Sequence, residues 1–226
     1  MTMPGLEEKK TYFDQYWQEQ RAEIADPRAH QRAEYIYNLL EQKSGTLFDA
    51  GCGRGVALGF FADRGYDVGG ADISPLMVAK LVQEGYNVCL ADLEKGSLPG
   101  KYDIVICLEV LQQLYDPLSV LLKLKEALNA DGEMVVSVPN EFHIVSRLRL
   151  LFGRSHLGHY DHSHIRLFAP SRDRSLLDHA GLEITGSARV AIVPPRWKIL
   201  AGIFHPLAQL FPSLFALSSI YILRKK

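Results

Sequence analysis

The stretch TLFDAGCGRG, residues 46–55, decides the fold. Its first half is a short, mostly apolar run, and its second half carries glycines at 51, 53 and 55. Glycine tolerates left-handed backbone and lets a ligand approach the chain closely. A helical stretch follows at 56–64, so the first backbone N–H groups of that helix can face a ligand. The stretch therefore predicts a strand, a ligand-binding glycine turn and a helix.

Short apolar runs recur at regular intervals after this stretch. Strands are predicted at 46–50, 66–71, 86–91, 102–108 and 133–139, and helices between them at 56–64, 75–84 and 117–129. Strands that alternate with helices at this spacing indicate βαβ units and a parallel sheet. The runs lack polar alternation, which is typical of strands buried on both faces. The fold class is therefore α/β.

The flanks of this alternating region differ from it. Helices are predicted at 6–24 and 28–43, final strands at 182–193 and 218–224, and a partly helical apolar segment at 196–217. Residues 140–165 break the alternation. We predict a single domain over 1–226, divided into a helical cap (1–43), a ligand-binding core (44–139), a lid (140–170) and a C-terminal substrate-side portion (171–226).

Charge is distributed unevenly along the 226 residues, although the formal net charge is only −1. Residues 1–146 carry 13 Lys and Arg against 22 Asp and Glu, and residues 147–226 carry 12 against 4. The overall balance gives no indication of nucleic-acid binding. The basic C-terminal part is either a solvated surface or a surface near an anionic substrate, carrier or membrane.

The cysteines and the N-terminus bear on location. Cys52, Cys89 and Cys107 are an odd number without CxxC spacing, which favours a reducing, cytoplasmic setting. Cys89 and Cys107 lie in apolar runs, so we predict that both are buried. Residues 1–17 lack the apolar segment of a secretory signal, and no uninterrupted stretch has the length of a transmembrane helix.

Three acidic residues stand at the ends of the first three predicted strands. Asp49 precedes the glycine turn, Asp72 ends the second strand and Asp92 ends the third. Open α/β sheets bind ligands at the carboxyl ends of their strands, where Asp72 could accept hydrogen bonds from ribose and Asp92 from an adenine amino group. Position 56, where the dinucleotide pattern GxGxxG needs glycine, is Val56. The alternative for each feature alone is a helix cap or a turn.

These residues resemble a known family. Residues 47–55 are similar to motif I of class I S-adenosylmethionine-dependent methyltransferases. Further resemblances to the family's strand ends lie at 72–74, 91–93, 102–111, 131–133 and 138–140. The resemblance implies a doubly wound Rossmann-like methyltransferase sheet, mostly parallel with an antiparallel last strand, and S-adenosylmethionine as the cofactor.

The resemblance also implies the cofactor contacts. The implied cofactor-binding residues are Arg32, Asp49, Gly51, Cys52, Gly53, Asp72, Ile73, Asp92, Leu93 and Leu108. Leu108 would act through its backbone, next to the methionine part of the cofactor. Arg32 would reach the cofactor carboxylate, and its alternative is a surface arginine. The aromatic residues at 12, 13, 16 and 17 either close over the cofactor or dock their helix on the core.

Beyond the core, residues 164–168, 180–182 and 211–215 resemble a bacterial small-molecule branch that includes quinone and sugar O-methyltransferase-like proteins. The resemblance extends over residues 30–226. There are departures: Gln112-Gln113 stand where relatives often carry Glu-His, and Ala50 replaces a larger residue.

A methyl transfer to a hydroxyl also needs a base, and the sequence offers several candidates in the predicted lid. They are His143, His156, His159, Asp161, His162 and His164. We favour His164 as the catalytic base, because the matching family segment often bears a histidine. The alternatives are a histidine that only hydrogen-bonds within the lid, or a metal site, although the spacing fits no zinc signature and we predict no metal.

The sequence thus predicts an enzyme that methylates an oxygen, less favourably a nitrogen, of a small metabolite. The acceptor is expected to be anionic or carried on an anionic partner. The alternatives are a non-catalytic or regulatory S-adenosylmethionine-binding protein and a membrane-surface lipid or quinone methyltransferase. Nucleic acid is not an expected partner, and a membrane surface is the less favoured one.

Overall fold

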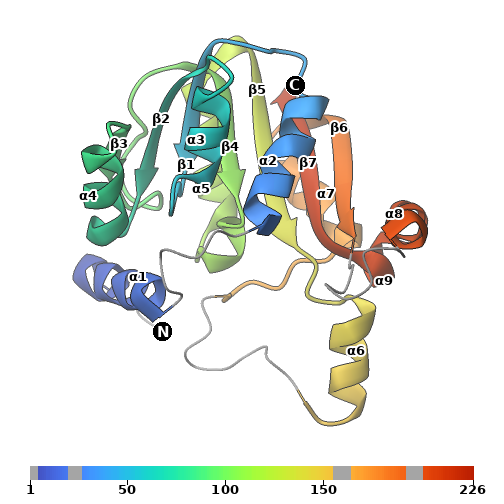
Figure 1. Ribbon diagram of the computed structural model, residues 1–226. Coiled ribbons are helices and arrows are strands. Elements are labelled where there is room, and N and C mark those ends of the chain that lie inside the picture. The colour runs from blue at the N-terminus through green and yellow to red at the C-terminus, as the bar shows by residue number, and fades with distance from the viewer. Residues whose placement is uncertain (1–4, 20–26, 155–163, 192–200) are drawn as a thin grey trace.

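A seven-stranded sheet organises the chain (Figure 1). The structure is a computed structural model that describes residues 5–19, 27–154, 164–191 and 201–226. The strand order is β3-β2-β1-β4-β5-β7-β6, and β7 runs antiparallel to the other six strands. The predicted doubly wound sheet with an antiparallel last strand is confirmed.

The strands agree closely with the sequence prediction in the middle of the sheet. Their bounds are β1 Thr46–Ala50, β2 Asp67–Asp72, β3 Asn87–Leu90, β4 Tyr102–Leu108, β5 Leu128–Pro139, β6 Leu182–Ala191 and β7 Ala216–Lys225. Strand β5 begins five residues earlier than predicted. The register shifts between Tyr102 and Ile104, so the stretch 131–133, which resembles the family's turn into its fifth strand, lies at an irregularity within β5.

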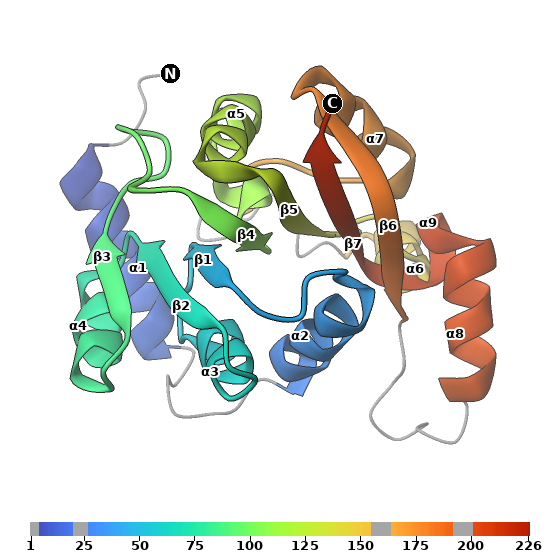
Figure 2. The same cartoon turned by 90° about the horizontal axis from the view of Figure 1, so that it is seen from above.

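Helices cover both faces of the sheet (Figure 2). Their bounds are α1 Leu6–Glu19, α2 Pro27–Leu39, α3 Val56–Ala62, α4 Pro75–Gln83, η1 Leu111–Gln113, α5 Pro117–Ala127, α6 Ile144–Leu151, α7 Pro170–His179, α8 Ala201–Leu210 and α9 Pro212–Phe215. Helices α5 and α7 lie on one face, and α2, α3 and α4 lie on the other. In Figure 1, α1 and α6 lie beyond the carboxyl ends of the parallel strands.

The two faces of the sheet form two cores. Along β4, Ile104 and Ile106 pack with α2 and α3, whereas Val105 and Cys107 pack with α5 and α7. All four side chains are fully buried. This explains why the sequence of β4 is an uninterrupted apolar run.

Local capping starts the helices that follow β2 and η1. The Ser74 hydroxyl accepts from the Met77 N–H at 3.2 Å, and the Asp116 carboxylate accepts from the Ser119 N–H at 3.0 Å. A proline at the first position of each helix supplies the right φ and lacks an N–H that would need a partner. These caps fix the chain just after the strand ends where the candidate site lies.

One burial prediction is wrong. Cys107 is buried as predicted, but Cys89 is exposed. Cys89 belongs to β3, which pairs only with β2 and forms the edge of the sheet. An edge strand lacks the second neighbour that covers an apolar residue in the middle of a sheet. Among the described residues, no helix is long and apolar enough to cross a membrane.

Candidate functional site

The glycine turn after β1 holds a backbone that other residues would disfavour. Gly51, Gly53 and Gly55 have φ angles of 87°, 49° and 75°. A Cβ at Gly51 would lie 2.5 Å from the Val110 side chain. The N–H groups of residues 51 and 52 both donate to the Ala71 carbonyl, at 2.8 and 3.1 Å. The turn is therefore fixed against the end of β2, and its glycines are required by conformation and by space.

Asp72 connects the turn to the next strand. Its carboxylate accepts from the Gly53 N–H at 2.8 Å and from the Ser74 N–H at 2.9 Å. Burial raises the pKa of Asp72, and these backbone hydrogen bonds oppose the rise. A carboxylate has about four acceptor positions, so two accepted N–H groups leave capacity for ligand hydroxyls.

Asp49 is the most deeply buried acid of the site. It is 3% exposed, and no described residue hydrogen-bonds its Oδ1. Burial, together with the nearby charge of Asp72, raises the pKa of Asp49 to about 8. An ionised carboxylate there is costly unless a cation lies beside it. The geometry thus favours a positively charged ligand group next to Asp49.

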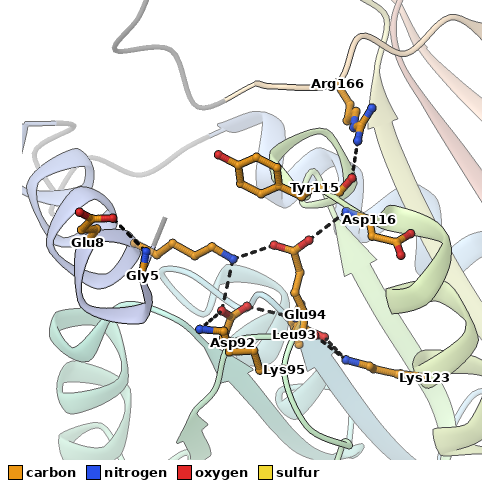
Figure 3. A network of polar contacts seen from close by, with 11 residues as sticks. Gly5, Glu8, Asp92, Leu93, Glu94, Lys95, Tyr115, Asp116, Lys123 and Arg166 are labelled. Atoms are coloured by element: carbon orange, nitrogen blue, oxygen red, sulfur yellow. Dashed lines mark hydrogen bonds and ion pairs between the residues drawn. The ribbon is translucent and has the colours of Figure 1, made fainter. Parts of the chain in front are cut away.

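Asp92 stands two residues after the end of β3 and forms an ion-pair network with the N-terminal helix (Figure 3). The Lys9 ammonium lies 3.2 Å from Asp92 Oδ2 and 2.7 Å from Glu94 Oε2. The side chains of Lys9, Asp92 and Glu94 are 11%, 4% and 8% exposed. Glu94 also accepts from the Asp116 N–H at 2.9 Å, which links this network to the start of α5.

Helix α1 makes two further contacts, with the residues that follow the carboxyl ends of β2 and β1. The Asp14 carboxylate accepts from the Ser74 hydroxyl and from the Leu76 N–H at the start of α4. The Trp17 ring lies against Gly53, where a Cβ would come within 2.8 Å of the ring. Helix α1 therefore covers the glycine turn and the ends of β2 and β3.

Arg32, on α2, is directed to the end of β4. Its guanidinium lies 3.1 Å from Glu109 Oε1, and the Ser137 hydroxyl donates to the same oxygen at 2.9 Å. Glu109 follows Leu108 directly and has a φ of 58°, an uncommon value for a residue other than glycine. Such strained positions often accompany functional sites.

The remaining predicted cofactor residues lie around the same edge. Ile73 is half-buried after β2, Leu93 is buried after Asp92, and Leu108 ends β4 half-buried. Cys52 is buried beside Gly70, and burial raises the pKa of its thiol, so it is not a nucleophile. The structure thus brings all ten predicted cofactor residues to the carboxyl edge of β1–β4 and the adjoining α2.

His164 lies beside these strand ends, next to Glu141, a buried acid that is not among the predicted site residues. Its Nδ1 is 2.5 Å from Glu141 Oε1, and the Glu141 side chain is 6% exposed. The N–H groups of Ile165 and Arg166 both donate to the Gln112 carbonyl at 2.9 Å. These two hydrogen bonds to η1 hold the segment that carries His164 near the end of β4.

The other histidine candidates divide into two groups. His143 caps α6, where its Nδ1 accepts from the Ser146 N–H at 3.3 Å. His156, His159, Asp161 and His162 lie outside the described residues. Within the described part of the chain, no group of three or more His, Cys, Asp or Glu residues could hold a metal ion.

A family model described as "Methyltransferase domain" matches residues 16–186. This range includes the glycine turn, the acidic strand ends and His164. The chain belongs to this family.

Curated relatives of this methyltransferase share a common name. The "Ubiquinone biosynthesis O-methyltransferase" of Aliivibrio fischeri strain MJ11 is 31% identical over 166 residues, 66% of this chain and 70% of the relative. The protein of that name from Aeromonas salmonicida is 29% identical over 73% of this chain and 76% of the relative. The chain spans only 50% of the length of the Pseudomonas paraeruginosa relative, at 32% identity.

Solved structures have the same fold as this methyltransferase. The magnesium protoporphyrin IX methyltransferase of Synechocystis, solved with bound SAH, has a TM-score of 0.70 at 18% identity and covers 98% of this chain and 100% of its own. A possible histamine N-methyltransferase from Thermotoga maritima has a TM-score of 0.69 at 15% identity, over 96% and 99% of the two chains.

Sequence reasoning missed several polar residues of this methyltransferase. Lys9, Glu94, Glu109 and Glu141 are all part-buried or buried and contact predicted site residues. A usable signal existed for the three acids, because each stands within three residues of a predicted strand end. No local signal marks Lys9, whose partners are more than eighty residues away.

Proposed function

We propose that this methyltransferase transfers a methyl group from S-adenosylmethionine to an oxygen of a small acceptor molecule. Family membership supports the reaction class, and the relatives named O-methyltransferase favour oxygen over nitrogen. Family membership also favours an enzyme over the non-catalytic binding protein considered above. The single observation that carries the proposal is the glycine turn with three acids at neighbouring strand ends.

The residues present fit this cofactor. Asp49, with its unpartnered buried oxygen, suits the cationic part of the molecule. Asp72 retains acceptor capacity for the ribose hydroxyls, with Ile73 beside it. Asp92 would accept from the adenine amino group with Leu93 alongside, sharing its carboxylate with Lys9.

The methionine end of the cofactor would lie near β4. The turn residues Gly51, Cys52 and Gly53 let it approach the backbone. Leu108, at the end of β4, would contact it through its backbone. Arg32 would hold the cofactor carboxylate while keeping its ion pair with Glu109, since a guanidinium has five N–H donors.

When bound, S-adenosylmethionine supplies an activated methyl group. The protein then has to align the acceptor with that methyl group, exclude water and remove the hydroxyl proton. We assign proton removal to His164. Glu141 is a positioning residue: by accepting from Nδ1–H it would fix the ring and leave Nε2 as the basic atom.

The acceptor would enter from the side of residues 140–170, the predicted lid, and of residues 194–217 in the C-terminal substrate-side portion. Residues 155–163 and 194–200 of these segments lie outside the described residues. An anionic or carrier-bound acceptor remains the expectation, because the C-terminal part is basic.

Calorimetry with S-adenosylhomocysteine and with NAD tests the cofactor assignment. We expect binding of the former and not of the latter. Asp72→Asn should weaken S-adenosylhomocysteine binding roughly 10- to 100-fold, because hydrogen bonds to a charged group are lost. Asp67→Asn is the matched control, since Asp67 is exposed at the opposite end of the same strand. Equal affinities in the two variants would refute the proposed site.

Turnover with a panel of small phenols and catechols tests the base. His164→Gln should lower kcat by about 10²–10⁴-fold and leave S-adenosylhomocysteine affinity unchanged. Glu141→Gln should lower kcat less, at constant acceptor KM, since an amide oxygen still accepts from Nδ1–H. Unchanged kcat in His164→Gln would assign the proton to another group.

A further inference from the structure

Helix α6 and the residues after it form the most exposed apolar segment of the described chain. Every residue from 147 to 154 is exposed, and the sequence there is RLRLLFGR. Leu151 and Phe152 are 80% and 79% exposed, and Leu148 and Leu150 are 47% and 49% exposed. A monomeric protein that leaves contiguous large apolar side chains in water usually uses them for binding.

The orientation of α6 is the reverse of an ordinary surface helix. Its buried residue is Ser146. With 3.6 residues per turn, Leu148, Leu151 and Phe152 project about 120–160° around the axis from Ser146. The apolar face is thus directed away from the protein and the small polar residue toward it. Packing of this domain's core does not account for such a face.

The charges beside this face are all positive. Arg147 and Arg149 lie about 100° to either side of it, and Arg154 follows the helix. No acidic residue occurs between Glu141 and Asp161. Arg147 is anchored to the carbonyl of Phe142 at 2.6 Å, while Arg149 and Arg154 are exposed. Exposed apolar residues flanked by arginines match the pattern of helices that lie in the interface of anionic bilayers.

The position of α6 is compatible with a flat partner. It lies at the outer end of the molecule, on the same side as the carboxyl edge of the sheet (Figure 1). Leu210 and Phe211, 72% and 55% exposed, precede α9, which contacts α6. A surface that contacts α6 would therefore also lie near the end of the molecule that carries the site.

We propose that residues 147–154 dock this protein on the surface of an anionic lipid bilayer. Leu148, Leu151 and Phe152 enter the headgroup region, and Arg149 and Arg154 bind lipid phosphates. This goes beyond the proposed methyl transfer and does not depend on it. It also gives the arginines a role other than binding a soluble acceptor.

A second copy of the chain is a less favourable partner for the apolar face of α6 than a bilayer. Pairing two α6 helices would bring arginines next to arginines without an acid between them. Four apolar side chains also fall well short of the roughly 800 Å² per partner that a stable protein interface buries. A bilayer offers complementary charge and needs no matching shape.

Vesicle co-sedimentation of the full chain tests the proposal. Vesicles of phosphatidylcholine with about one third phosphatidylglycerol should bind the protein, pure phosphatidylcholine should bind it far less, and high salt should release it. Leu151→Glu/Phe152→Glu should reduce binding more than tenfold. Arg149→Gln/Arg154→Gln should reduce it by about fivefold per arginine.

Val82→Glu is the matched control, because Val82 is an apolar residue of α4 that is 54% exposed. All variants should keep the S-adenosylhomocysteine affinity and circular dichroism of the parent, so a loss of vesicle binding is not a loss of folding. Equal binding to both vesicle types, no binding to either, or equal losses in Val82→Glu would overturn the proposal. So would sedimentation velocity showing a dimer that Leu151→Glu/Phe152→Glu dissociates without any vesicle binding.

Discussion

At the scale of single residues, Asp49 shows how the site couples charge to burial. Its carboxyl group is buried at the end of a central strand, with the charge of Asp72 nearby, and its pKa is raised to about 8. Near pH 7 the carboxyl group is therefore mostly protonated while no cation is beside it. A cationic ligand would favour the ionised form and expel that proton.

We expect S-adenosylhomocysteine binding at pH 7 to release roughly one proton, because its ammonium group would lie beside Asp49. Calorimetry in two buffers with different ionisation enthalpies measures this release. Asp49→Asn should abolish it. Asp103→Asn is the control: hydrogen bonds from Thr46 and Asn129 hold the pKa of Asp103 below its usual value, at the other end of the sheet. An identical wild-type enthalpy in both buffers would contradict the expectation.

At the scale of elements, α1 is held by a few polar contacts with residues distant in sequence. None of its residues is buried, so its packing against the core is limited. Burial lowers the pKa of Lys9, but the hydrogen bond to Glu94 and the charge of Asp92 raise it more, so the ammonium is charged. Without Lys9, two carboxylates would face each other at the end of β3.

Lys9→Ala should therefore loosen α1. Leaving the buried side of an ion pair unpaired costs about 1–3 kcal/mol, which predicts hydrogen exchange over residues 6–19 that is roughly 5- to 150-fold faster. Lys10→Ala is the neighbouring control, because Lys10 pairs only with the exposed Glu7 of the same helix among the described contacts. Equal exchange in both variants would show that the Lys9 network does not hold the helix.

At the scale of the whole molecule, two buried carboxyl groups make stability depend on pH. Asp49 lies near the carboxyl end of β1. Asp173 lies in the first turn of α7, where burial raises its pKa to about 6 although the Tyr221 hydroxyl donates to it at 2.9 Å. Between the unfolded and folded pKa values, the folded state keeps protons that the unfolded state has lost. Stability should thus fall as pH rises from about 4, through 6 for Asp173 and 8 for Asp49.

Urea unfolding of the cofactor-free protein at pH 5, 6.5 and 8 measures this decline. The shift at Asp173 alone corresponds to roughly 3 kcal/mol lost between pH 4 and pH 6. Asp173→Asn should reduce the slope between pH 5 and 6.5 to the part that Asp49 contributes, since an amide still accepts from Tyr221 and does not titrate. A free energy of unfolding that rises with pH over this range would be inconsistent with the two buried acids.

The sequence predicted the middle of the sheet better than its edges. The bounds of β1 and β4 agree to the residue, because central strands buried on both faces need uninterrupted apolar runs. The exposure of Cys89 was not predicted, because an edge strand such as β3 can have the same apolar composition as a central strand. The sequence also did not predict that the apolar face of α6 points outward. Periodicity shows which residues share a face of a helix, but not which way that face points.

The sequence by itself determined the glycine turn, the order of strands and helices, and the acids at the strand ends, because parallel strands bring their carboxyl ends to one edge whatever the details of packing. Only the tertiary structure decided which distant residues meet there. Lys9 with Asp92, Arg32 with Glu109 and Glu141 with His164 are long-range pairs. Such pairs depend on how helices dock on the sheet, and docking is set by the three-dimensional fit of the whole core rather than by any local pattern.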